Sequence, residues 1–118
     1  MMKEDNIIRN KSYNFSLKII KIYQELTLEK REFILSKQLI RSGTSIGANV
    51  EEAVGAQSKN DFIAKLSISY KESWETLYWL RLLTDSKFLN DQQSSSLISD
   101  CEELLKILGS ILKTAKTP

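Results

Sequence analysis

Small and apolar residues recur at helical spacing between residues 35 and 53, and this pattern restricts the fold more than any other part of the chain. One line contains Leu35, Leu39, Gly43, Ile46, Val50 and Ala53. Around its centre, every residue from 42 to 48 except Ile46 is Ser, Thr, Gly or Ala. Gly costs roughly 0.5–1 kcal/mol relative to Ala inside a helix, so the run indicates that a neighbouring backbone comes very close. We predict a packing motif formed by Gly43, Ser45, Gly47 and Asn49.

Asn49 lies beside the apolar line and one helical turn after Ser45. Two interpretations stay open from the sequence. The amide either lies on the helix surface, or it is buried and hydrogen-bonded, like the Asn that fixes register in coiled coils. Ser45 itself has no neighbouring base and no strand–turn–helix context, so a role as nucleophile is not expected.

Three other stretches have the same helical period, and the predicted helices span about 10–26, 28–54, 59–84 and 91–115. The first has two apolar lines, and we predict that both are buried in one wide face. The first line contains Phe15, Ile19, Ile22 and Leu26, and the second contains Tyr13, Leu17, Ile20 and Tyr23. Thr27 is the expected N-cap of the second helix, while Asn90 and Gln93 predict a capping box at the start of the fourth.

The chain has 118 residues with only one Pro and four Gly, a composition that disfavours an all-β fold. Short connections between helical stretches imply antiparallel neighbours. We therefore predict an all-α protein, a single domain over residues 1–118 that forms an up-down-up-down antiparallel four-helix bundle. A lone Cys101 and the lack of any long apolar segment favour a cytoplasmic protein without a membrane partner.

The chain contains no His, which removes the commonest general base and the usual nucleophile–base pairs. Carboxylates on the second and third helices could together hold a hard cation, but Lys and Arg lie within a turn or two of them. We predict a salt-bridge network among Arg41, Glu52, Lys71, Glu72 and Glu75, with simple surface exposure as the alternative. No catalytic residue, cofactor or metal is expected, and the protein is predicted not to be an enzyme.

Large aromatic residues gather on the third helical stretch, at Trp74, Tyr78 and Trp79. One interpretation is an exposed edge that forms an oligomer interface, because such residues are enriched at interfaces. The other is that all three fill the core of the bundle. The net charge of +2 is only mildly basic, and it gives slight support to nucleic-acid binding.

Four segments resemble the four helix bundle protein family, also called the 23S rRNA intervening-sequence protein family. They are Lys11–Ser16, Ser45–Ala53, Ser58–Ile68 and Lys71–Leu83. The resemblance independently implies the four-helix bundle. It also implies a homo-oligomer, a homopentamer by analogy with the related accessory variability proteins of diversity-generating retroelements, and a nucleic-acid or protein partner. The alternatives are a ribosome- or rRNA-associated protein and, less favoured, an enzyme.

Overall fold

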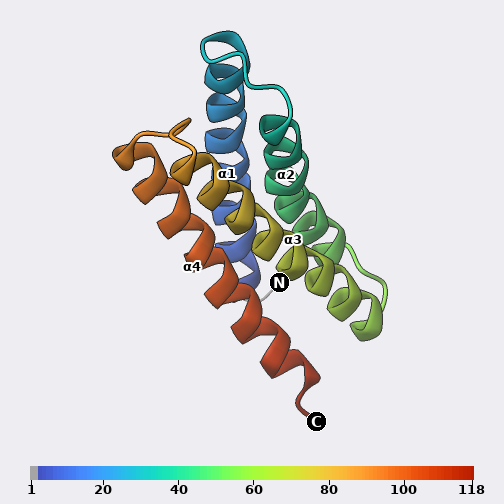
Figure 1. Cartoon of the computed structure of the whole chain (residues 1–118). Coiled ribbons are helices and arrows are strands. Elements are labelled where there is room, and N and C mark those ends of the chain that lie inside the picture. The colour runs from blue at the N-terminus through green and yellow to red at the C-terminus, as the bar shows by residue number, and fades with distance from the viewer. Residues whose placement is uncertain (1–2) are drawn as a thin grey trace.

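Four helices account for almost the whole chain in the computed structural model, which describes residues 3–118 and the side chains from residue 7 onward. They are α1 (Lys3–Leu28), α2 (Leu35–Val54), α3 (Lys59–Asp85) and α4 (Asp91–Lys116). Successive helices run in opposite directions and together form an elongated bundle of 48 × 21 × 19 Å (Figure 1). The predicted all-α, up-down-up-down bundle is confirmed.

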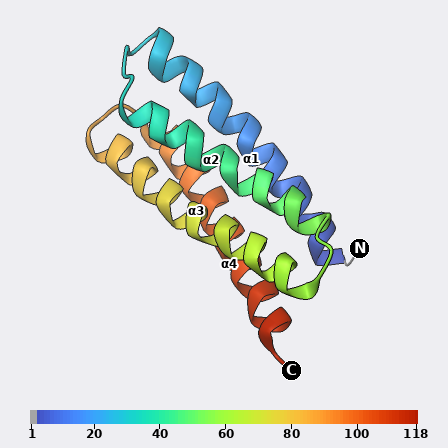
Figure 2. The same ribbon diagram turned by 90° about the vertical axis from the view of Figure 1, so that its right-hand side faces the viewer.

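The four helices pack in a cycle, so that each helix has two neighbours and one diagonal partner. The contacts join α1 to α2, α2 to α3, α3 to α4 and α4 to α1, and over the described residues the diagonal pair α1 and α3 makes none. Figure 2 shows α1 and α3 on either side of α2. The outer faces of α1 and α3 are therefore far apart in one chain, although both helices run in the same direction.

A continuous apolar core runs along the axis of the bundle. Each helix contributes one buried line, as the helical period requires. The fully buried members with the largest side chains are Ile8, Phe15, Ile19, Leu26, Leu39, Ile46, Leu66, Leu80, Leu83, Leu97, Leu104 and Leu108. Cys101 occupies the middle of the α4 line and is also buried. Within residues 3–118, none of the helices combines the length and apolar character needed to cross a membrane.

The starts of α3 at Lys59 and α4 at Asp91 follow the sequence prediction, whereas α1 begins at Lys3 rather than near residue 10 and α2 begins later than predicted. The Asn90 side chain accepts from the Gln93 backbone N–H, and the Gln93 side chain accepts from the Asn90 N–H, so the capping box of α4 is present. The predicted start of α2 at residue 28 with Thr27 as its cap is wrong. The α1 helix continues through Leu28, and the Thr27 hydroxyl donates to the Tyr23 carbonyl.

Glu32 caps α2 in place of Thr27. Its carboxylate accepts backbone N–H groups from Ile34, Leu35 and Ser36, at 3.2, 3.1 and 2.7 Å. Burial acts to raise the pKa of Glu32, but these hydrogen bonds outweigh it and hold the pKa below its ordinary value. The preceding turn requires a left-handed backbone at Arg31, with φ of 55°.

Candidate functional site

The two helix-interior glycines of α2 face α1, and they explain the small-residue run. A Cβ added at Gly43 would lie 3.0 Å from the Ile19 side chain, and one at Gly47 would lie 3.3 Å from the Ser12 carbonyl oxygen. Both distances are tighter than ordinary Cβ contacts. At Gly47 the α1 backbone comes close to α2, and at Gly43 the Ile19 side chain fills the space that a Cβ would need, because these positions lack side chains.

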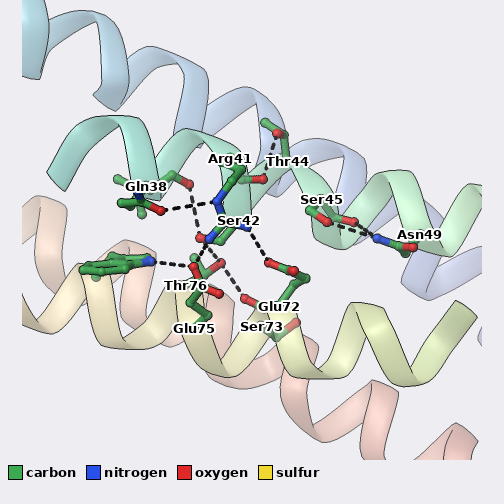
Figure 3. Close-up of polar contacts among 12 residues, drawn as sticks. Gln38, Arg41, Ser42, Thr44, Ser45, Asn49, Glu72, Ser73, Glu75 and Thr76 are labelled. Carbon is green, nitrogen blue, oxygen red and sulfur yellow. Dashed lines mark hydrogen bonds and ion pairs between the residues drawn. The ribbon is translucent and has the colours of Figure 1, made fainter. Parts of the chain in front are cut away.

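Hydroxyl groups replace glycines where α2 meets α3. The Ser69 hydroxyl donates to the Ile46 carbonyl across the two helices, at 2.8 Å. Ser42 and Thr76 are completely buried, and the Thr76 hydroxyl donates a hydrogen bond of 2.9 Å to the Ser42 hydroxyl (Figure 3). Among the side chains the structure describes, no buried N or O atom lacks a hydrogen-bond partner. This contact is therefore polar and fully satisfied, as a buried polar group requires.

The structure separates the other two members of the predicted packing motif from the helix contacts. The Asn49 side-chain amide is half-buried and donates to the carbonyl and the hydroxyl of Ser45, at 2.9 and 3.0 Å, within α2 itself (Figure 3). Among the described residues its side chain hydrogen-bonds only within α2, so it does not fix the register of the bundle in the way a coiled-coil Asn does.

Arg41 lies at the α2–α3 boundary between two carboxylates of α3. Its guanidinium pairs with Glu72 at 3.3 Å and also with Glu75 (Figure 3). The predicted member Glu52 pairs separately with Lys65, at 3.2 Å. Lys71 is exposed and takes part in none of the ion pairs found between residues 7 and 118.

These pairings bear on the metal chemistry that the carboxylates could have. The guanidinium of Arg41 already pairs with both Glu72 and Glu75, so these carboxylates are not free to bind a metal ion. Among the described residues, no three His, Cys, Asp or Glu side chains come together as a group that could hold a metal ion. The arrangement can hold α2 against α3, and it offers no set of free ligands.

The aromatic residues of α3 divide into two environments. Trp74 and Tyr78 are 54% and 52% exposed and lie on the outside of the bundle. Trp79 is half-buried, packs against the core, and donates its indole N–H to Glu75 at 2.9 Å. Tyr70 meets Trp74 edge to face, with ring centroids 6.3 Å apart. Two of the three residues proposed as an interface are thus accessible, and the third packs mainly against the core of its own bundle.

A hollow of 390 Å³ lies beside Trp74, between α3 and α4. Tyr70, Trp74, Leu77 and Leu105 provide its apolar lining, and Gly109 and the charged residues Glu102 and Lys106 complete it. A Cβ at position 109 would meet the Tyr70 ring at 3.4 Å. We call Tyr70, Trp74, Leu77 and Tyr78, together with this hollow, the aromatic edge.

Three of the four residues in the second apolar line of α1 are exposed, contrary to the prediction that both lines are buried. Tyr13 is 63% exposed, Leu17 is 50% exposed and Ile20 is also exposed, while Tyr23 is half-buried. The reason is geometric, because the core takes the line through Ile19 and the three exposed residues lie on the part of the helix surface that is turned away from it. We call Tyr13, Leu17 and Ile20 the α1 row. Sequence reasoning could have found it, since two full apolar lines on one helix exceed what a two-neighbour position can cover.

The α1–α4 contact is closed largely by charged side chains. Lys11 pairs with Glu103 at 3.0 Å, and Lys18 pairs with Asp100 and also bonds Ser96 at 2.7 Å. Their side chains retain between 40% and 52% of their exposure. Such pairs contribute little to stability in water.

Cys101 follows Asp100 in sequence but points into the core. Its Sγ donates to the Ser73 carbonyl at 3.3 Å. Burial, helped by the neighbouring carboxylates Glu102 and Asp100, raises the pKa of the thiol to about 12. A protonated, buried thiol of this kind is neither a nucleophile nor a metal ligand.

Comparison with known proteins agrees with this bundle. The chain matches the family described as 23S rRNA-intervening sequence protein over residues 4–110, and it belongs to that family. A crystal structure of a protein of unknown function from the S23 ribosomal protein family of Bacteroides thetaiotaomicron is similar, with 47% identity and a TM-score of 0.91. The similarity covers 93% of this chain and 98% of that one. Comparison with curated proteins gives no significant match.

Proposed function

We propose that this protein is a non-enzymatic scaffold that acts as a homo-oligomer. The observation that carries the proposal is the aromatic edge, where Trp74 and Tyr78 are about half exposed and Trp74 lines a largely apolar hollow. Large amphipathic aromatic side chains in such a position are typical of interface anchors. The number of copies, five, is taken only from the family resemblance.

The chemistry of the described side chains favours a scaffold over an enzyme. The chain has no His, the carboxylates of Glu72 and Glu75 are paired with Arg41, and the lone thiol is buried. None of these groups offers the activated nucleophile or the general base that most catalytic mechanisms need.

The finer proposal is that the oligomer binds a polyanion such as nucleic acid. Each copy adds a net charge of +2, so assembly concentrates a charge that is weak in one chain. Exposed cations such as Lys21, Lys37 and Lys71 take part in none of the ion pairs among the described side chains. Binding of this kind falls steeply as salt is added, because it depends on counterion release.

The experiment is a measurement of native mass by light scattering, made on the wild type and on Trp74→Ala. We expect an oligomeric mass for the wild type and a smaller mass for the variant, with helicity by circular dichroism unchanged. Ile34→Ala is the matched control, because Ile34 is 77% exposed in the α1–α2 loop, away from the aromatic edge. A monomeric wild type at micromolar concentration would refute the scaffold.

The polyanion proposal is tested on the same preparations. Nucleic acid that co-purifies at low salt and is released by about 1 M salt, where the Debye length is about 3 Å, is the expected result. Sequencing of that nucleic acid would distinguish ribosomal RNA from other sources. A preparation that contains no nucleic acid and does not bind a mixed RNA and DNA pool at low salt would contradict the polyanion proposal. The scaffold proposal would still stand.

A further inference from the structure

We infer that the contact between α1 and α4 is a salt-sensitive latch, along which these two helices separate while the α2–α3 contact stays closed. We call this contact the seam. It is formed by Lys11, Lys18 and Glu25 of α1 and their partners on α4. Opening of the seam rearranges intact helices and does not require any helix to unfold. It is a property of one chain and does not depend on the proposed oligomer.

The order of the helices leaves the seam as the side of the bundle that no loop closes. Residues 29–34, 55–58 and 86–90 join α1 to α2, α2 to α3 and α3 to α4. Helices α1 and α4 also pack together, but in the described chain they are held only by side-chain contacts. The seam therefore depends on its side-chain contacts more than the other three sides do.

Three polar pairs at regular spacing close the seam. Lys11, Lys18 and Glu25 lie one heptad apart, so they follow one stripe of α1. Their partners come in the reverse order along α4: Lys11 pairs with Glu103 at 3.0 Å, Lys18 pairs with Asp100, and Glu25 accepts a hydrogen bond of 2.7 Å from the Gln93 side chain. The two lysine pairs are about half exposed, so salt can screen them and each adds little stability.

Between the three pairs, the seam is hollow down to the core. A cavity of 170 Å³ between the first and second pairs is lined by Phe15 and Leu104, and one of 380 Å³ between the second and third pairs is lined by Ile22 and Leu97. All four apolar residues belong to the buried core. Atoms that line a void lack contact partners on one side, so the seam lacks the close packing that holds α2. Opening of the seam uncovers these four side chains.

The opposite side of the bundle, between α2 and α3, is held by hydrogen bonds that salt does not reach. The Ser69 hydroxyl donates to the Ile46 carbonyl at 2.8 Å, and the Thr76 hydroxyl donates to the Ser42 hydroxyl at 2.9 Å. All three hydroxyl-bearing residues are fully buried, where screening by salt is much weaker than at an exposed ion pair. The α2–α3 contact is therefore the side that stays closed when the seam opens.

Cys101 is a natural reporter of this opening. It lies in the core line of α4 and is completely buried in the closed bundle, so a thiol reagent reaches it only when the bundle opens. The labelling rate, divided by the rate for the unfolded chain, gives the fraction of open molecules. We expect this fraction in the wild type to exceed the globally unfolded fraction from urea titration by about tenfold or more, because local opening requires less free energy than global unfolding.

Two variants that each remove one exposed ion pair test whether the seam is the side that opens. Lys18→Gln removes a pair of the seam, and Arg9→Gln is the matched control, because it removes the pair of Arg9 with Glu51 between α1 and α2. The two cations are equally exposed, at 44% for Lys18 and 43% for Arg9. We expect Lys18→Gln to speed the labelling of Cys101 about two- to fivefold, and Arg9→Gln to leave it unchanged. In about 1 M salt, wild type and Lys18→Gln should react at the same rate.

A second reporter tests whether the α2–α3 contact stays closed. Ser69→Cys combined with Cys101→Ser places the one remaining thiol in that contact. We expect this thiol to react only as fast as the global unfolding of the same variant permits. Circular dichroism establishes that each variant is folded.

Three results would overturn the latch. The first is labelling of Cys101 at the rate set by global unfolding. The second is a Lys18→Gln variant that labels no faster than the wild type, or no faster than Arg9→Gln. The third is a thiol at position 69 that reacts as fast as Cys101, because the opening would then not be confined to the seam. The native mass does not enter any of these results, so the latch and the proposed function fail or stand separately.

Discussion

The contacts of α2 and the α1–α4 contact close the same bundle by different means. Helix α2 meets its neighbours through glycines and buried hydroxyls, with Gly43 and Gly47 facing α1 and Ser42 facing α3, and ion pairs such as Arg9–Glu51 and Lys65–Glu52 lie only at the exposed margins of these contacts. Helices α1 and α4 meet through long charged side chains that remain about half exposed, such as Lys18 and Asp100. The first kind of contact depends on shape and on satisfied buried hydrogen bonds, and the second depends on charges that water and salt can screen.

The difference indicates which helix contacts tolerate amino-acid substitution and which do not. A close contact of backbones leaves no space for a larger side chain. A contact made of exposed ion pairs tolerates substitution because little free energy is lost with each pair. Local opening is therefore expected to begin between α1 and α4.

The largest effect is expected when a side chain is forced into the α1–α2 contact. Gly47→Leu, and likewise Gly43→Leu, should lower the free energy of unfolding by about 3 kcal/mol, the upper part of the range for overpacking. Urea unfolding followed by circular dichroism gives the value. Ala48→Leu is the control, since Ala48 is exposed on the same helix, and its effect should stay within about 0.5 kcal/mol. Equal effects at positions 47 and 48 would contradict the comparison.

A smaller effect is expected from the buried hydroxyl pair between α2 and α3. Thr76→Val keeps the shape but leaves Ser42 without this partner, and it should cost about 1–3 kcal/mol. Ser42→Ala should lower the free energy of unfolding less in the Thr76→Val background than in the wild type. In that background the Ser42 hydroxyl has already lost the hydrogen bond from Thr76. A double-mutant cycle measures this coupling. Strict additivity of the two changes would show that the hydrogen bond has no energetic role.

The smallest effect is expected in the α1–α4 contact. Lys18→Gln should lower the free energy of unfolding by less than about 1 kcal/mol, and the loss should vanish in about 1 M salt, where charges are screened. Unfolding curves at low and high salt give the comparison, with Thr76→Val as the reference whose cost should not change with salt. A salt-independent loss at Lys18 would mean that its stem, and not its charge, supports the contact.

The sequence predicts the helices better than it predicts which of their faces are covered. The lines through Ile46 and Leu104 and the Asn90 capping box follow directly from spacing and capping chemistry. The start of α2 does not, because Glu32 caps through a side chain longer than the usual Ser, Thr, Asn or Asp.

The candidate site could be predicted only in part, for a related reason. Periodicity identifies two apolar lines on α1, but it cannot decide which one faces the core when both have the same spacing. The exposure of Leu17 becomes visible only when the neighbours of α1 are known. Trp79 shows the opposite difference, because the sequence favours an exposed interface residue and the structure half-buries it. Its indole bonds Glu75, a carboxylate that also pairs with Arg41, and periodicity alone does not reveal this contact.

The order of the four helices also gives the bundle a direction. Lys3 and Lys116 lie at one end, while the loop that joins α1 to α2 and the loop that joins α3 to α4 lie at the other (Figure 2). In any ring whose copies all run in the same direction along its axis, every copy would present its termini on one rim and these two loops on the opposite rim. Such a particle has a top and a bottom. Cargo fused to either terminus would then project from a single side, so that a symmetric assembly would display it with a defined polarity.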